Sequence, residues 1–265
     1  MKTKFIMTAI LILFFIGSKA STYSSKEKNT FVIVHGAWSK ASDWDNVSNS
    51  LKTKGYNVLM VNLPGHGDDK TPMNSITLQT YVDAVKKVIG TKEEIILVGH
   101  SFGGIVISQV AEEIPQQIKK LIYIAAYIPK NGESLFSIAQ TDTQSHIGKY
   151  LKINESEGYV QIAKEGVIDV FAADAPKPIG EYIASNIQPE PLTPLATPVK
   201  LSNSRFGKIK KTAILTTEDH TISIALQEKM AKEANIENQL FMKSSHTPFI
   251  AHTEKLIHFL LEEAK

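Results

Sequence analysis

The sequence predicts an α/β protein with a mostly parallel central sheet flanked by helices. Two apolar, β-branched runs end in glycine or proline, in residues 30–36 and 56–67, as buried parallel strands do. A segment that can form one helix, residues 39–55, separates them, and Gly55 is expected to end it. Such alternation of strand and helix favours a parallel sheet with right-handed crossovers.

Two further strand and helix pairs continue this pattern. Ser75 is expected to cap a helix whose apolar residues recur at steps of three and four. Residues 93–100 then predict a strand, and the helix that follows should end at Pro115. Residues 119–127 predict the next strand.

The pattern changes in residues 128–201, where the strand signal fades and prolines accumulate. A stretch of this length is more plausible as a small helical cap inserted over the sheet than as a structureless loop. The alternation resumes in residues 210–263 with a strand, a helix, a strand and a closing helix. Residues 21–265 are therefore expected to form one domain that carries this cap.

The first 20 residues predict a signal peptide. Lys2 and Lys4 precede an apolar run of about 13 residues, and small residues up to Ala20 suit cleavage after that position. The run is too short to serve well as a stable membrane anchor. The chain is thus expected to be exported, to a periplasm or outside the cell, and a bacterial source fits the short leader.

The amino-acid composition limits the kinds of partner that this chain is expected to bind. The 265 residues can bury a large core, and they include no cysteine, so disulfides, thiol nucleophiles and thiolate metal ligands are excluded. The net charge of +2 gives no broad field for nucleic acid or anionic lipid. A small-molecule partner is therefore expected, while the oligomeric state is left open.

Ser101 is the first candidate catalytic residue. The sequence Gly99-His100-Ser101-Phe102-Gly103 stands between a predicted strand and a predicted helix, which is the context of a nucleophile elbow. In this tight turn the flanking glycines avoid collisions, and the serine is expected to stand exposed at the carboxyl edge of the sheet.

A serine hydroxyl needs a base, and the base needs an acid. Chain order in folds with this elbow places the acid after a later strand and the histidine after the last strand. His246 fits the base, and Asp219 fits the acid better than the neighbouring Glu218. The other histidines receive no catalytic role: His66 is interpreted as a turn residue, His146 has no identifiable partner, and His220 is expected to be exposed.

The oxyanion formed during attack on a carbonyl needs backbone donors. The N–H of Phe102, directly after the nucleophile, is one candidate. The N–H of Ala37, in the loop after the first strand, is the other, and Gly36 would allow that loop to approach closely. Four aromatic residues are candidates for an apolar substrate pocket, although core packing explains them as well: Trp38, Phe136, Phe171 and Tyr182.

Several stretches together resemble the α/β-hydrolase superfamily. They are "FVIVHGAW", "VNLPGHGDD", "LVGHSFGG", "LTPLATPVKL", "LTTEDHTIS" and "SSHTPF". The branch they resemble contains small bacterial carboxylesterases, plant methylesterases of the salicylic-acid-binding type and hydroxynitrile lyases. The resemblance implies a Ser101-Asp219-His246 triad, an oxyanion hole from Ala37 and Phe102, a helical cap, and no metal or organic cofactor.

Two positions separate the members of this branch. Hydroxynitrile lyases of this type have a threonine where this chain has Gly36, and a lysine where it has Thr247. The resemblance therefore favours a carboxylesterase that cleaves small, largely apolar esters through an acyl-enzyme. The alternatives are lyase-like or other acyl-transfer activity on the same triad, or a binding protein with little turnover.

Overall fold

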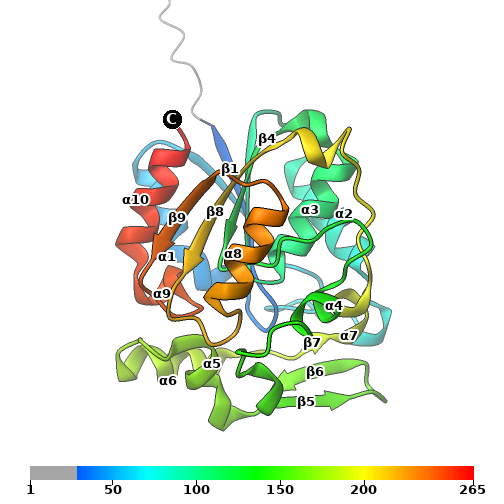
Figure 1. The fold of residues 1–265 in the computed structure, drawn as a ribbon, viewed down its shortest axis with the longest axis vertical. Coiled ribbons are helices and arrows are strands. Elements are labelled where there is room, and N and C mark those ends of the chain that lie inside the picture. Colours follow the sequence, from blue (N-terminus) through cyan, green and yellow to red (C-terminus); the bar gives the residue numbers. More distant parts are fainter. Residues whose placement is uncertain (1–28) are drawn as a thin grey trace, which may run out of the picture.

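A computed structural model describes residues 29–265, and the predicted signal peptide lies outside them. Six strands form one parallel sheet in the order β2-β1-β3-β4-β8-β9. The strands are β1 (Thr30–Val34), β2 (Asn57–Val61), β3 (Ile95–His100), β4 (Ile118–Ile124), β8 (Lys210–Thr216) and β9 (Asn238–Met242). The predicted parallel α/β architecture is confirmed (Figure 1).

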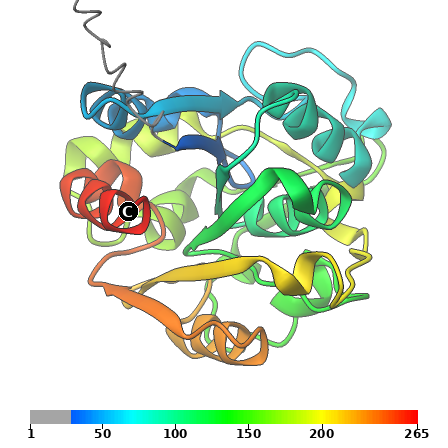
Figure 2. The ribbon, with the colours of Figure 1, turned by 90° about the horizontal axis from the view of Figure 1, so that it is seen from above.

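Helices cover both faces of this sheet (Figure 2). One face carries α1 (Asp45–Thr53), α9 (Pro248–Ala251) and α10 (Thr253–Glu263), and the other carries α2 (Leu78–Ile89), α3 (Gly103–Glu113) and α8 (Ile224–Glu233). Successive side chains of β1 point to opposite faces of the sheet. Phe31 and Ile33 pack with α1 and α10, whereas Val32 and Val34 pack with α2 and α3. Strands buried on both faces explain the nearly continuous apolar runs of the sequence.

The start of α2 differs from the sequence prediction. The Thr77 side chain caps this helix by accepting a hydrogen bond from the Thr80 N–H, whereas Ser75 lies in the preceding 3₁₀ turn, Met73–Ser75. The Thr80 side chain in turn accepts from the Thr77 N–H, so a reciprocal capping box fixes the first turn.

Residues 135–196, which lie between β4 and β8 in the chain, stand beyond the carboxyl ends of the strands (Figure 1). We call residues 135–196 the cap. It contains the helices α4 (Leu135–Ala139), α5 (Val167–Ala172), α6 (Lys177–Asn186) and α7 (Leu192–Ala196). It also contains an antiparallel sheet of β5 (Leu151–Asn154), β6 (Tyr159–Ile162) and β7 (Glu190–Pro191), which the sequence did not predict.

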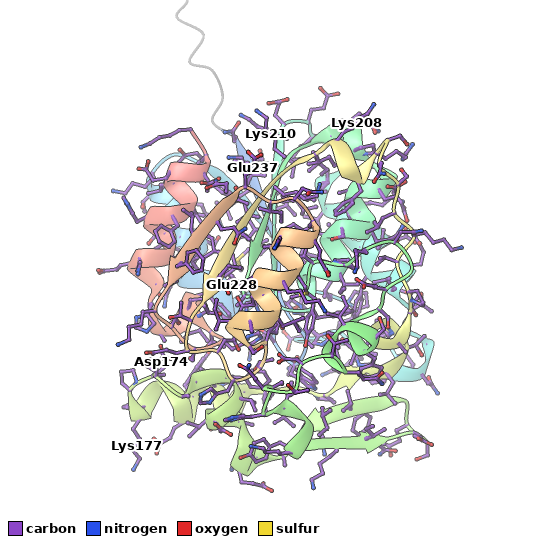
Figure 3. The ribbon with its side chains drawn as sticks, in the orientation of Figure 1. Asp174, Lys177, Lys208, Lys210, Glu228 and Glu237 are labelled. Atoms are coloured by element: carbon purple, nitrogen blue, oxygen red, sulfur yellow. The ribbon has the colours of Figure 1, made fainter. Side chains whose placement is uncertain are left out.

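The cap and the amino ends of the strands lie at opposite ends of the molecule. Figure 3 shows Lys177 on the cap, Lys208 and Lys210 at the far end, and Asp174 on the side of the cap that faces the main sheet. No helix within residues 29–265 combines the length and the apolar character that crossing a membrane would require.

Candidate active site

Ser101 lies in the sharp turn between β3 and α3. Its φ of 51° is in the left-handed region, which is strained for a residue with a side chain. A Cβ on Gly99 would lie 2.7 Å from the Gly103 carbonyl oxygen, and a Cβ on Gly103 would lie 2.7 Å from that of Val34. The two glycines are therefore required by close backbone contacts. Ser101 is buried rather than exposed, with 4% of its surface accessible.

His246 and Asp219 come together at the same edge of the sheet. Asp219 follows β8, His246 follows β9, and His246 Nδ1 lies 2.8 Å from Asp219 Oδ2. Glu218, the alternative acid, faces Lys243 at 3.5 Å instead and is substantially exposed. The geometry therefore pairs the histidine with Asp219.

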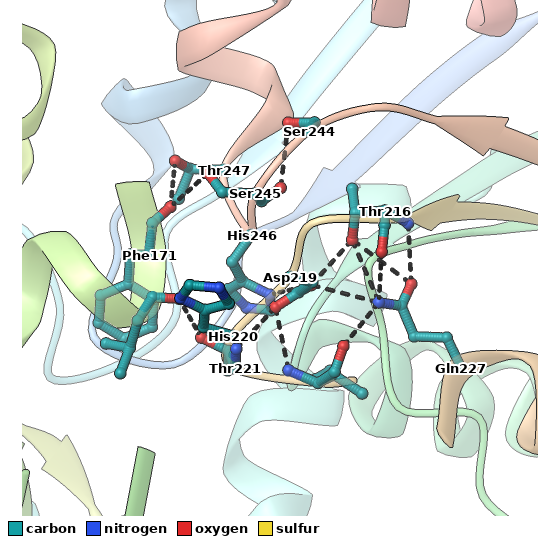
Figure 4. Close-up of polar contacts among 12 residues, drawn as sticks. Phe171, Thr216, Asp219, His220, Thr221, Gln227, Ser244, Ser245, His246 and Thr247 are labelled. Atoms are coloured by element: carbon teal, nitrogen blue, oxygen red, sulfur yellow. Dashed lines mark hydrogen bonds and ion pairs between the residues drawn. The ribbon is translucent and has the colours of Figure 1, made fainter. Parts of the chain in front are cut away.

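The Asp219 carboxylate is fully hydrogen-bonded (Figure 4). Its Oδ1 accepts from the N–H groups of Thr221 and Ile222, at 2.8 and 3.0 Å. Its Oδ2 accepts from the Thr216 hydroxyl at 2.8 Å and from the Gln227 amide at 3.3 Å, besides His246. These donors hold the carboxylate in one orientation toward the imidazole.

The second nitrogen of His246, Nε2, is buried and has no hydrogen-bond partner within residues 29–265. The ring lies 4.7 Å, centroid to centroid, from that of His100, the residue directly before Ser101. An Nδ1–H that donates to Asp219 leaves a lone pair on Nε2, so this nitrogen can accept a proton.

Ala37 and Phe102 lie where oxyanion donors are expected. Their N–H groups form no hydrogen bond with any residue of the described chain. Gly36 packs directly against the nucleophile turn, because a Cβ there would lie 2.8 Å from both His100 Nδ1 and Ser101 Cβ. The loop after β1 thus passes Ser101 at close range.

A buried carboxylate of the cap, Glu190, fixes this loop. Glu190 Oε2 accepts from the N–H of Trp38 at 3.1 Å and pairs with His66 Nε2 at 2.8 Å, while Oε1 accepts from the Tyr81 hydroxyl at 3.0 Å. Burial opposes protonation of His66, but the Glu190 carboxylate outweighs it and raises the pKa of His66. His66 is therefore a buried partner of the cap, not only a turn residue as the sequence indicated.

Two more buried histidines support the site, and sequence reasoning assigned them no role. His35 Nδ1 donates to the Gly36 carbonyl at 2.8 Å while Nε2 accepts from the Leu63 N–H, and burial lowers its pKa to about 3. His100 Nε2 donates to the His246 carbonyl at 2.8 Å, and burial also places its pKa well below the usual value. Both rings are neutral braces of the two loops that flank Ser101.

A pocket of about 40 Å³ opens against Ala37 and His246. Three of the four aromatic candidates are among its lining residues: Trp38, Phe171 and Tyr182. Phe136 does not line this pocket; on α4 its side chain packs against the apolar core. Further lining comes from α6 and the residue that follows it, which sequence reasoning did not single out: Ile183, Asn186 and Ile187.

Comparison with known proteins identifies the fold family. A model of the "Alpha/beta hydrolase family" matches residues 31–258. The chain belongs to this family. The match spans the strand ends that carry Ser101, Asp219 and His246, as well as the whole cap.

Similar proteins come from plants and bacteria. The Arabidopsis thaliana protein named "Putative methylesterase 11, chloroplastic" is 30% identical over 254 residues, 90% of this chain, and the chain spans 65% of its length. "Salicylic acid-binding protein 2" of Nicotiana tabacum is 26% identical over 90% of this chain and 98% of its own.

A solved structure extends the likeness to an extracellular protein. An extracellular alpha/beta-hydrolase from a Paenibacillus species, described as sharing structural and functional homology with the tobacco protein, has a TM-score of 0.79 to this chain. It is 25% identical, and the match covers 88% of this chain and 98% of that one.

Proposed function

We propose that this chain is a serine carboxylic-ester hydrolase that cleaves small, largely apolar esters through an acyl-enzyme. The observation that carries the proposal is the hydrogen-bonded His246–Asp219 pair, which follows β8 and β9 of the parallel sheet in which the strained elbow turn of Ser101 follows β3. Folding needs no acid and histidine there, whereas nucleophilic catalysis by a hydroxyl needs both.

The steps follow from the positions of the donors. His246 Nε2 takes the proton of Ser101 Oγ as that oxygen attacks the ester carbonyl, and the N–H groups of Ala37 and Phe102 donate to the resulting oxyanion. The protonated imidazole, stabilised by Asp219, gives its proton to the departing alcohol. Water then attacks the acyl-enzyme by the same route, and the acid leaves while Ser101 regains its proton.

The pocket supports a small substrate group. Its volume of about 40 Å³ and its largely apolar lining suit a small apolar substrate group such as a short alkyl chain. Relatives named methylesterases are consistent with a small alcohol group leaving the site.

Hydroxynitrile lyase activity is less well supported. The threonine that such lyases have at position 36 would bring a side chain to within 2.8 Å of His100 and Ser101. Position 247, a lysine in those lyases, is here a threonine whose hydroxyl donates to the Phe171 carbonyl at 2.7 Å. Neither position offers a polar group directed at a cyanohydrin.

The test is hydrolysis of p-nitrophenyl esters from acetate to octanoate, beside the variant Ser101→Ala. We expect turnover of the short esters that disappears in Ser101→Ala and persists in a matched control, Ser204→Ala, which changes an exposed serine remote from the site. Wild-type protein that cleaves no ester and resists a fluorophosphonate probe would contradict the proposal and favour a binding role. Cyanide release from mandelonitrile at a rate comparable to ester cleavage would instead favour a lyase.

We also propose that the protein is exported and that residues 1–20 are removed. The lysines at positions 2 and 4, the apolar run and Ala20 support this proposal. Amino-terminal sequencing of protein recovered outside the cytoplasm should begin at Ser21. Recovery of the uncleaved chain from the cytoplasm alone would overturn it.

A further inference from the structure

Two histidines and an aspartate from distant parts of the chain meet at the border between the cap and the Asp219 loop. His146 precedes β5, Asp169 lies on α5, and His220 directly follows Asp219. His146 Nδ1 lies 3.1 Å from both carboxylate oxygens of Asp169, and His220 Nδ1 lies 2.9 Å from Oδ1. One ligand atom of each residue lies within 4.8 Å of those of the other two.

The spacing of these atoms suits a metal ion. Imidazole nitrogen and carboxylate oxygen bind zinc at about 2.0 to 2.2 Å, so neighbouring ligands around one tetrahedral ion lie about 3.4 Å apart. The two Nδ1 atoms already lie near that distance from Asp169 Oδ1, and an expansion of a few tenths of an ångström would admit the ion. The side chains are about one third exposed, so an ion can reach them from solvent.

The surroundings hold the ligands in place. The Tyr150 hydroxyl donates to Asp169 Oδ2 at 3.1 Å, which orients the carboxylate. The His146 N–H donates to the His220 carbonyl at 2.8 Å, so the backbone fixes the two histidines relative to each other. Their rings lie side by side, with centroids 4.3 Å apart. The ligands are thus arranged before an ion arrives.

We propose that His146, Asp169 and His220 form a binding site for a divalent transition-metal ion of the zinc type. Two imidazoles disfavour Mg²⁺ and Ca²⁺, which prefer oxygen ligands. Three protein ligands leave at least one coordination position for water. The ion would bridge two cap segments to the loop of Asp219, and so fasten the cap over the candidate active site without taking part in ester cleavage. The proposal is independent of the proposed hydrolase activity.

The chain offers a matched control for this site. His252 Nε2 lies 2.7 Å from Asp174 Oδ2, so this pair also joins the core to the cap and is also half-buried. It has only one imidazole. The variant His252→Gln therefore changes a hydrogen bond between the core and the cap without removing a ligand of the proposed ion.

Zinc binding can be measured directly on protein that is purified without a polyhistidine tag and stripped with EDTA. By isothermal titration we expect one Zn²⁺ per chain, and at hundredfold excess over Kd a rise in Tm of about 5 to 10 °C. Mg²⁺ should produce neither effect. Co²⁺ should give visible absorption bands characteristic of four- or five-coordinate cobalt.

Substituting each proposed ligand in turn tests whether these three side chains bind the ion. His146→Gln, Asp169→Asn and His220→Gln should each lower the affinity for Zn²⁺ at least tenfold and abolish the rise in Tm, whereas His252→Gln should retain both. Because His146 belongs to a partly exposed turn of the cap, its variant should remain folded, and Tm without metal checks this. Absence of stoichiometric binding at millimolar Zn²⁺, or equal loss in His252→Gln, would overturn the proposal.

Discussion

The Glu190 carboxylate in the cap accepts a hydrogen bond from the N–H of Trp38, over 3.1 Å, directly beside the candidate oxyanion donor Ala37. The two residues are 152 positions apart in the chain. Glu190 is fully buried, and the same carboxylate binds His66 and Tyr81 from the main domain. A single side chain of the cap therefore sets the position of the loop that is expected to bind the oxyanion.

The variant Glu190→Gln should impair catalysis through this loop. The amide cannot accept from Trp38, His66 and Tyr81 at once, so the Ala37 N–H loses its fixed position. We expect kcat for p-nitrophenyl acetate to fall about 10- to 100-fold with little change in KM. Breaking the buried pair with His66 should also lower the free energy of unfolding by about 3 kcal/mol.

A second, partly buried carboxylate allows loss of stability to be distinguished from loss of loop positioning. Glu112 accepts from the N–H groups of Ser202 and Phe206, remote from Ser101. Glu112→Gln should lower stability in urea unfolding but leave kcat unchanged. If kcat falls equally in both variants, the loss in Glu190→Gln reflects general destabilisation and the positioning role is wrong.

Replacing Asp219 should remove most of the turnover. Asn at this position can turn its amide N–H toward His246, which would then carry its proton on Nε2 and could no longer accept one from Ser101. By analogy with serine proteases, kcat should fall about 10³- to 10⁴-fold. Steady-state kinetics of Asp219→Asn beside Glu218→Gln tests this, since Glu218 faces Lys243 and its variant should be fully active. Equal losses in the two variants would contradict the choice of acid.

The sequence predicted the sheet and the pairing of His246 with Asp219 because both depend on local patterns. Apolar runs mark strands buried on both faces, and residues that follow parallel strands meet at one edge. Gly99 and Gly103 mark the turn of Ser101 because the backbone leaves no room for a Cβ. The apolar runs, the residues after the strands and the two glycines can all be recognised without knowing the structure of the cap.

Other features depended on contacts that no local pattern encodes. The strands β5 and β6 have only four residues each and mix polar with apolar side chains, so their signal was too weak to detect. Glu190, His146 and His220 read as isolated polar residues, because their partners come from segments far away in the chain. Burial of such groups becomes visible only when the cap is in place over the sheet.

Gly36→Thr should not convert the chain to a lyase but should inactivate it. A Cβ at this position would approach His100 Nδ1 and Ser101 Cβ to 2.8 Å, so the loop or the nucleophile turn must move. We expect kcat/KM for p-nitrophenyl acetate to fall at least about 100-fold and the free energy of unfolding to fall by about 1 to 3 kcal/mol.

The control for that substitution is Gly148→Thr, because a Cβ on Gly148 meets no atom within 4 Å. It should leave both kcat/KM and stability close to those of the wild type. A fully active Gly36→Thr variant would show that the loop after β1 yields easily, contrary to the close packing against Ser101.

Acid should destabilise the protein through its buried neutral histidines. The pKa of His35 is lowered to about 3 by burial and by the neighbouring His66, while the unfolded chain has the ordinary value near 6.5. Between pH 6.5 and pH 3, His35 binds a proton in the unfolded state but not in the folded state. The contribution of the neutral His35 to the free energy of unfolding is therefore present above pH 6.5 and is lost as the pH falls toward 3. The lowered pKa of His100 should likewise reduce the stability of the protein in acid. The pKa of His66 is raised, so protonation of this residue should instead favour the folded state as the pH falls.

From pH 7 to pH 5, His35 alone should lower the free energy of unfolding by about 2 kcal/mol. Urea unfolding at the two pH values measures this for the wild type and for His35→Gln, whose amide oxygen can still accept from the Leu63 N–H. The variant should be less stable at pH 7, but its loss between the two pH values should be smaller by about 2 kcal/mol. His258→Gln, which changes an exposed histidine, should keep the full wild-type loss. An undiminished loss in His35→Gln would mean that other groups dominate acid unfolding and that His35 is not held neutral by burial.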